Sequence, residues 1–137
     1  MEAEVFMDTA YAVALSARSD QYHDRAFDLR IQMKAEQTRL LTTQGVILEV
    51  GNALSKRLYR AAAIRLIVSL LLDPNVEIVS LSADLVSKAF QLFAQRDDKE
   101  WGLTDCVSFV VMRERGIREA LTADGHFRQA GFLTLLE

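Results

Sequence analysis

The stretch Val5-Phe6-Met7-Asp8-Thr9 decides the fold that we expect for this chain. Three bulky apolar residues in a row are typical of a strand buried on both faces, as in a parallel sheet. The run stops at an acid and a hydroxyl residue, and a helical pattern follows. Because ligands bind at the carboxyl ends of strands in open α/β sheets, Asp8 is a candidate site residue. The alternative is that Asp8 or Thr9 only caps the helix beginning near Ala10, a common use of both residue types.

The composition is that of one compact domain. The chain has 137 residues, of which 50% are hydrophobic and 26% charged, with one proline. This is enough to bury a real core, so we expect residues 1–137 to form a single domain. The only cysteine, Cys106, excludes an internal disulfide and fits a reducing compartment.

No segment predicts export or a membrane anchor. The first residues lack both a basic region and a long apolar run, so we expect no signal peptide. The apolar runs at 46–54 and 107–112 are too short to span a membrane. We therefore expect a cytoplasmic protein that makes no contact with a membrane.

The net charge of −3 restricts how the protein could handle nucleic acid. Generic nucleic-acid binders carry a basic footprint, which this chain lacks overall. Contact with RNA or DNA would therefore need a local basic patch, together with metal ions that offset an acidic site.

Strand and helix patterns alternate along the chain. After the first strand, we expect strands at 40–43, 76–79, 119–123 and 132–135. Helical patterns occupy 10–17, 21–37, 46–59, 60–72, 82–94 and 106–114, the last of which is apolar nearly all round in its first half. This alternation predicts an α/β fold with a mostly parallel central sheet and helices on both faces.

Four acids are candidates for a site. Asp8 and Asp124 are expected at the ends of the first and fourth strands, and Asp105 in the first turn of the buried helix, with Thr104 as its N-cap. Glu49 lies at the edge of an apolar helical arc, from which a long side chain can reach into a cleft. Each acid has a simpler explanation: a favourable helix dipole for Asp105, a turn at Asp124, and a boundary position for Glu49. Together these explanations are weaker, since a doubly wound sheet brings strand-end acids to one crevice.

Converging carboxylates predict a cation. Without one they repel each other, and at least one would be forced to protonate. Oxygen ligands suit Mg²⁺ or Mn²⁺, which also engage substrate phosphates. Zinc is not expected, because His23, His126 and Cys106 have no ligand-like spacing. A metal held by carboxylates supports the hydrolytic chemistry of two-metal nucleases.

Four segments resemble, in order, the motifs of PIN-domain nucleases, and most closely those of the small toxin-like (VapC-type) members. They are VFMDT at 5–9, EVGNAL at 49–54, WGLTDC at 101–106 and LTADGHF at 121–127. The resemblance covers nearly the whole chain, from Val5 to Leu135. It implies a three-layer α/β/α sandwich, Mg²⁺ or Mn²⁺ as cofactor, and cleavage of RNA.

The resemblance also assigns roles to residues. It implies that Asp8, Glu49 and Asp105 are the core catalytic and metal-binding acids and that Asp124 is the fourth. By the same match, the supporting polar residues are Thr9, Asn52 and Thr104.

The toxin-like resemblance implies a small antitoxin partner whose tail packs on the protein and places a basic side chain near the acids. The expected landing surface lies on the helices at 46–72, where Ile64, Ile67, Val68 and Leu71 offer more apolar area than one core uses. We expect the same residues to support a homodimer.

RNA contacts are expected at Lys56 and Arg60, which follow Glu49 by seven and eleven residues. If the helix continues, both lie on the side of Glu49, with Lys56 roughly 10 Å away. The alternative is an ordinary solvated basic face.

Other functions fit the residues less well. The chain has no Walker A or G-x-G-x-x-G motif, so a nucleotide-binding enzyme is not expected. Haloacid-dehalogenase-type phosphatases carry D-x-D, but Ala10 stands where the second acid would be, and the acidic pair of a receiver domain is missing too. The remaining alternative is a catalytically inactive PIN module that acts in RNA binding or protein regulation.

Overall fold

A five-stranded parallel sheet forms the centre of the computed structural model, which describes residues 1–137. The strand order is β3-β2-β1-β4-β5, and every neighbouring pair is parallel. The strands are β1 (Glu4–Met7), β2 (Arg39–Thr43), β3 (Val76–Val79), β4 (Glu119–Leu121) and β5 (Leu133–Thr134). The strand predicted from Val5-Phe6-Met7 is therefore the middle one, and the prediction of a mostly parallel sheet is confirmed.

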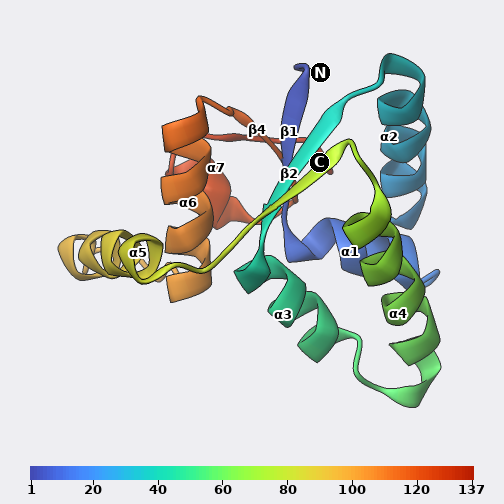
Figure 1. Cartoon of the computed structure of the whole chain (residues 1–137), viewed down its shortest axis with the longest axis horizontal. Coiled ribbons are helices and arrows are strands. Elements are labelled where there is room, and N and C mark those ends of the chain that lie inside the picture. The colour runs from blue at the N-terminus through green and yellow to red at the C-terminus, as the bar shows by residue number, and fades with distance from the viewer.

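Helices cover both faces of the sheet, as Figure 1 shows. On one side lie α1, α2 and α4, and on the other lies α6, with α5 packed outside it. The helices are α1 (Thr9–Ser16), α2 (His23–Glu36), α3 (Gln44–Ala53), α4 (Arg57–Leu72), α5 (Ala83–Gln95), α6 (Leu103–Arg115) and α7 (Gly125–Gln129). This is the predicted three-layer α/β/α architecture.

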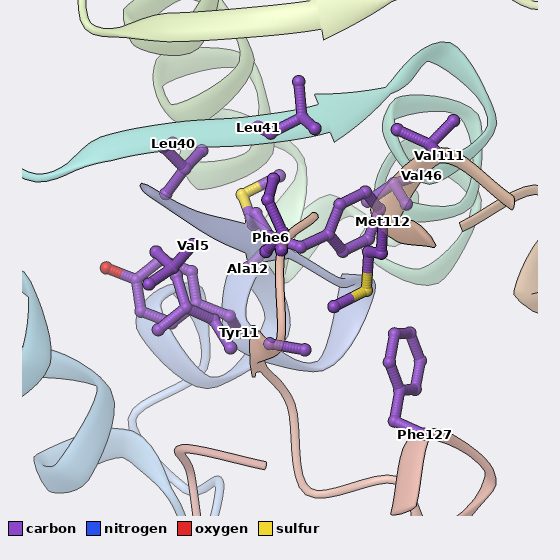
Figure 2. Packing of buried hydrophobic residues seen from close by; sticks show 14 of the residues in the cluster. Val5, Phe6, Tyr11, Ala12, Leu40, Leu41, Val46, Val111, Met112 and Phe127 are labelled. Atoms are coloured by element: carbon purple, nitrogen blue, oxygen red, sulfur yellow. The ribbon is translucent and has the colours of Figure 1, made fainter. Parts of the chain in front are cut away.

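The core is built around β1. Val5, Phe6 and Met7 are each 0% exposed, as expected for a strand with helices on both faces. Successive side chains of a strand point to opposite faces. Figure 2 accordingly shows Val5 beside Tyr11 of α1, while Phe6 points toward Met112 of α6. The central strand thus holds the two helical layers together.

The carboxyl edge of the sheet is where several helices begin. Because the strands are parallel, they all end at this edge, and α1 and α3 start directly after β1 and β2. Figure 1 shows the first turn of α6 at the same edge. Thr43 caps α3, its hydroxyl accepting a 3.2 Å hydrogen bond from the Val46 N–H. Residues at these helix starts are therefore brought together.

The helix predicted at 46–59 is wrong in its second half. Helix α3 ends at Ala53, and α4 begins at Arg57 after a short connection. Leu54 is only 2% exposed, so the chain turns there to place this side chain in the core. The apolar pattern runs through this turn and conceals it in the sequence.

Three smaller expectations also need correction. Strand β4 ends at Leu121, so Asp124 is not a strand end but the N-cap of α7. Helix α6 begins at Leu103 with Gly102 at its N-cap, so Thr104 is not the cap. The last strand is shorter than predicted, with only Leu133 and Thr134 paired to β4.

One predicted helix end is confirmed. Gly116 closes α6 in the left-handed conformation, with φ of +67°, which glycine adopts without steric cost.

None of the helices combines the length and the apolar character that crossing a membrane requires.

Candidate metal centre

Asp8 lies at the carboxyl end of the central strand and is 7% exposed. It occupies the N-cap position of α1, but its side chain makes no capping hydrogen bond. Instead, Oδ2 accepts a 2.8 Å hydrogen bond from the hydroxyl of Thr122. Burial raises the pKa of Asp8 to about 6, and the charges of Asp105 and Asp124 act in the same direction. Helix capping therefore does not explain this residue.

Thr122 positions two of the acids. It is fully buried in the segment after β4, and its oxygen also accepts a 3.1 Å hydrogen bond from the Asp124 N–H. One hydroxyl thereby fixes the Asp8 carboxylate and the backbone of Asp124. Thr122 was not among the predicted site residues, although its place between a strand and Asp124 in the segment 121–127 was a usable signal.

Asp105 lies in the first turn of α6, as predicted. Its Oδ2 accepts a 3.1 Å hydrogen bond from the Gly102 N–H at the start of the helix. The same oxygen lies 3.1 Å from Nδ1 of His126. Burial is the main cause that raises the pKa of Asp105, and Asp124 adds to it. The helix start therefore holds this carboxylate beside the other acids rather than in open solvent.

His126 stands between two acids, which the sequence did not reveal. Its Nδ1 is 3.6 Å from Oδ1 of Asp124, and its backbone N–H donates a 2.9 Å hydrogen bond to that same oxygen. Possible ligand atoms of Asp105, Asp124 and His126 all lie within 4.8 Å of one another. His126 and Asp105 are 21 residues apart, so no local spacing pointed to this group.

Glu49 is connected to the site through Thr9. The Thr9 hydroxyl donates a 3.0 Å hydrogen bond to Oε2 of Glu49. Glu49 is half-buried, in agreement with its predicted border position on the helix. Because Thr9 directly follows Asp8, this bond holds Glu49 next to the end of β1. Glu49 is not part of the closer group formed by Asp105, Asp124 and His126.

The other supporting residues have different surroundings. Asn52 is exposed on α3, and the structure does not join its side chain to the acids. Thr104 is half-buried, and its methyl group lies 3.4 Å from where a Cβ on Gly45 would stand. Thr104 therefore packs α6 against the start of α3.

The single helix assumed for RNA contact at Lys56 and Arg60 is wrong. That prediction required one helix from Glu49 through both residues, whereas Lys56 is the N-cap of a separate helix. Arg60 donates from Nε to the carbonyl of Ser55 across 3.0 Å. Both side chains are exposed, but the geometry that placed them beside Glu49 is absent.

The donor set suits a divalent cation. Asp8 lies close enough to Asp105 and Asp124 for their charges to raise its pKa, although it is outside the tighter group of Asp105, Asp124 and His126. No lysine or arginine forms an ion pair with any of these three acids. Such a cluster is costly when fully ionised, and a bound cation removes the cost. Four carboxylates match the oxygen preference of Mg²⁺ and Mn²⁺, and the imidazole adds one nitrogen. The residues present therefore fit such an ion.

Fold and site together define a class: α/β proteins with an acidic centre, suited to a cation, at the carboxyl edge of a parallel sheet. The PIN domain family model matches residues 5–133. The chain belongs to the PIN domain family, which confirms the resemblance found in the sequence motifs.

Two curated relatives and one solved structure extend this comparison. The chain is 30% identical over 129 residues to the 23S rRNA-specific endonuclease VapC20 of two Mycobacterium tuberculosis strains, a match covering 94% of this chain and 95% of the relative. The crystal structure of M. tuberculosis VapC20, described as a sarcin-ricin loop cleaving toxin, superposes with a TM-score of 0.81 at 29% identity. It covers 94% of this chain and 96% of that one. The predicted likeness to VapC-type proteins is thereby confirmed.

A more distant structure shares the fold. VapBC2 from Rickettsia felis, crystallised bound to a DNA fragment from its promoter, matches with a TM-score of 0.68 at 14% identity, covering 96% of both chains.

Proposed function

We propose that this protein is a divalent-metal-dependent endoribonuclease that acts as the toxin of a toxin–antitoxin pair. The observation that carries the proposal is the convergence of Asp8, Asp105 and Asp124 in a chain of the PIN family: the charges of Asp105 and Asp124 raise the pKa of Asp8, and that of Asp124 raises the pKa of Asp105. Glu49 is held next to Asp8 by the hydrogen bond that it accepts from the Thr9 hydroxyl, and we count it as the fourth acid.

The relatives support the class of reaction. The match to an enzyme named as a 23S rRNA-specific endonuclease extends over nearly the full length of both chains. It bears out the predicted activity, an endoribonuclease of the toxin-like PIN type. We propose ribosomal RNA as the substrate class, because that is the substrate in the relative's name.

The chain's own residues supply binding and orientation. Asp8, Glu49, Asp105 and Asp124 would hold the metal, and Thr122 and Thr9 fix two of these carboxylates by hydrogen bonds of 2.8 and 3.0 Å. Mg²⁺ or Mn²⁺ bound here supplies a Lewis acid for phosphodiester hydrolysis. Because Asp8 is buried in a low-dielectric environment, its negative charge acts strongly on any nearby cation.

His126 favours Mn²⁺ over Mg²⁺ in this proposal. An imidazole nitrogen suits transition-metal ions better than Mg²⁺, which prefers oxygen and water. His126 lies close enough to Asp105 and Asp124 to share a cation with them. The His126 nitrogen would therefore join the carboxylate oxygens of Asp105 and Asp124 in holding the metal.

An antitoxin partner is proposed for the exposed face of α4. Ile64, Val68 and Leu71 are 57%, 47% and 64% exposed, and Ile67 between them is half-buried. Apolar patches of this kind mark protein interfaces. We propose that a small antitoxin covers this face in the cytoplasm, and that the same face supports a homodimer of the free toxin.

Cleavage by the purified protein tests the proposal directly. Wild type with Mg²⁺ or Mn²⁺ should cut ribosomal RNA, EDTA should stop it, and Asp105→Asn should be at least a hundredfold slower. Asp98→Asn is a matched control, because Asp98 is an acid paired with Arg96 on the surface and should leave the rate unchanged. If the wild type binds RNA but cuts none with either metal, the chain is instead an inactive RNA-binding PIN module.

A further inference from the structure

A cavity of about 420 Å³ lies at the edge of the sheet opposite the acids. Its walls are α2 and α4, and its floor includes Leu40 and Val76 near the starts of β2 and β3. Figure 1 shows α1, α2 and α4 on the same side of the sheet. The metal centre lies at the edge where the parallel strands end, whereas the cavity lies at the edge where they begin. The two sites share no residue.

The size and lining match those of sites for small molecules. Such pockets typically enclose roughly 300–1,000 Å³ and are mostly apolar, with a few converging polar groups. Seven of the 14 lining residues here are hydrophobic, among them Met33, Leu66 and Leu70. The cavity therefore has enough apolar surface to hold the apolar part of a small molecule.

One tyrosine lines the cavity. Tyr11 is only 4% exposed and lines the cavity from α1. Figure 2 shows its ring beside Val5, with the oxygen directed away from Phe6. Burial raises the pKa of Tyr11 to about 12, Arg30 acts in the opposite direction, and no hydrogen bond contributes. The hydroxyl has no hydrogen-bond partner in the protein and is not sealed from solvent, so it is free to donate to an acceptor on a ligand.

The rim of the cavity carries an excess of positive charge. Arg30 and Lys34 lie one turn apart on α2, and neither forms an ion pair. The only lining acid is Asp73, whose Oδ1 already accepts a 2.8 Å hydrogen bond from the Asn75 N–H. Lys34 also suits the C-terminal dipole of α2, but this does not account for Arg30 or Tyr11.

We propose that this cavity binds a small carboxylic acid with an apolar body, such as an aromatic or branched-chain acid. The carboxylate accepts from the Tyr11 hydroxyl and pairs with Arg30, while the apolar body packs on Met33 and Leu66. Guanidinium groups favour carboxylates because their geometry is complementary. The proposal uses none of the metal-centre residues and is independent of the nuclease function.

Three probes of similar shape but different charge test whether the cavity prefers a carboxylate. The probes are 4-phenylbutyrate, 4-phenylbutan-1-ol and 4-phenylbutylamine, titrated into the whole protein by calorimetry and by NMR of its methyl and amide signals. We expect the carboxylate to bind at least about tenfold more tightly than the alcohol, as a charge-assisted hydrogen bond implies, and the amine to bind weakest. Shifted signals should include Met33, Leu40 and Leu66.

Variants test which residues recognise the acid. Tyr11→Phe keeps the ring and should weaken the binding of 4-phenylbutyrate about fivefold. The double variant Arg30→Gln with Lys34→Gln should weaken it about tenfold or more. Tyr22→Phe and Arg18→Gln with Arg65→Gln are matched controls outside the cavity and should change nothing. If Tyr11→Phe fails to fold, the charge variant decides. Equal affinity for the three probes, or shifts confined to the metal centre, overturns the proposal.

Loss of the metal centre should leave this binding intact. Asp105→Asn should keep the wild-type affinity for 4-phenylbutyrate, because the two sites are at opposite edges of the sheet. A parallel loss would place the acid at the metal centre and overturn the cavity assignment. Failure of RNA cleavage alone leaves the cavity result standing, so the two proposals fail separately.

Discussion

The hydroxyl of Thr122 donates a 2.8 Å hydrogen bond to Oδ2 of Asp8, although the two residues are 114 positions apart in sequence. The contact forms because β1 and β4 are neighbouring parallel strands, with Met7 paired to Leu121. The same hydroxyl accepts from the Asp124 N–H. One buried hydroxyl therefore orients both the Asp8 carboxylate at the end of the central strand and the segment that carries Asp124.

Removing this hydroxyl should slow RNA cleavage and shift its pH dependence. Thr122→Val keeps the shape but deletes a hydrogen bond that lowers the pKa of Asp8, so that pKa should rise above its present value of about 6. The acid limb of the pH–rate profile should then move to higher pH. A hydrogen bond to a charged group is worth about 1.5–3 kcal/mol, so the rate at neutral pH should fall roughly ten- to hundredfold.

Thr42→Val is the matched control for this change. Thr42 is also fully buried at a strand end, but its hydroxyl donates to the carbonyl of Met7 and touches no acid. It should lose stability without moving the pH profile. Identical profiles for the two variants would show that Thr122 does not tune Asp8.

Replacing Asp8 by Asn should abolish most activity while preserving the fold. The amide oxygen can still accept from Thr122, but the negative charge that attracts a cation is lost. We expect Mg²⁺ and Mn²⁺ to bind more weakly by calorimetry and RNA cleavage to fall by orders of magnitude. Undiminished cleavage by Asp8→Asn would remove Asp8 from the site.

Without metal, the protein should be more stable at mildly acid pH than at neutral pH. The folded-state pKa of Asp8 is about 6, above the value of about 3.9 for an unfolded aspartate, so the folded state binds this proton more tightly. Stability contributed by the protonated form is complete below pH ~4 and is lost as the pH rises through ~6. The loss is at most about 3 kcal/mol. Asp105 is shifted in the same direction.

Urea unfolding in EDTA at several pH values measures how the free energy of unfolding changes with pH. Asp8→Asn should reduce this pH dependence and should be more stable than the wild type at neutral pH. Added Mn²⁺ should raise the stability of the wild type. If Asp8→Asn is instead the less stable protein in EDTA at pH 7, charge repulsion does not destabilise the metal-free site.

His126 should control which metal binds best. His126→Ala removes the only nitrogen from the cluster with Asp105 and Asp124, so affinity for Mn²⁺ should fall about tenfold and affinity for Mg²⁺ much less. Calorimetric titration with each ion measures both. His23→Ala is the control, because His23 Nδ1 contacts the carbonyl of Ala14 away from the acids. Equal losses for the two ions would exclude a ligand role.

The exposed face of α4 should be needed for control by the antitoxin but not for cleavage. Val68→Lys places a charge in the apolar patch and should prevent rescue of growth by the protein encoded beside this gene. Purified Val68→Lys should still cut RNA at the wild-type rate. Ala61→Lys, at an exposed position of the same helix, serves as control. Rescue of Val68→Lys by the antitoxin would place the interface elsewhere.

The sequence by itself determined the layers of this protein and the region of its site. A run of three fully buried residues requires cover on both faces, and Val5-Phe6-Met7 indeed forms the central strand. Strand patterns separated by helical ones require parallel pairing, which sends all strand ends to one edge. These features follow from local periodicity and burial, which the order of residues encodes directly.

Only the tertiary structure decided which residues meet at that edge. The pairing of β1 with β4 brings Thr122 to Asp8, and the approach of α7 to α6 brings His126 to Asp105. No local pattern carries these contacts, because strand order and helix placement depend on how the whole core packs. The same reason explains the error at Lys56, since burial of Leu54 ends α3 where the helical pattern continues.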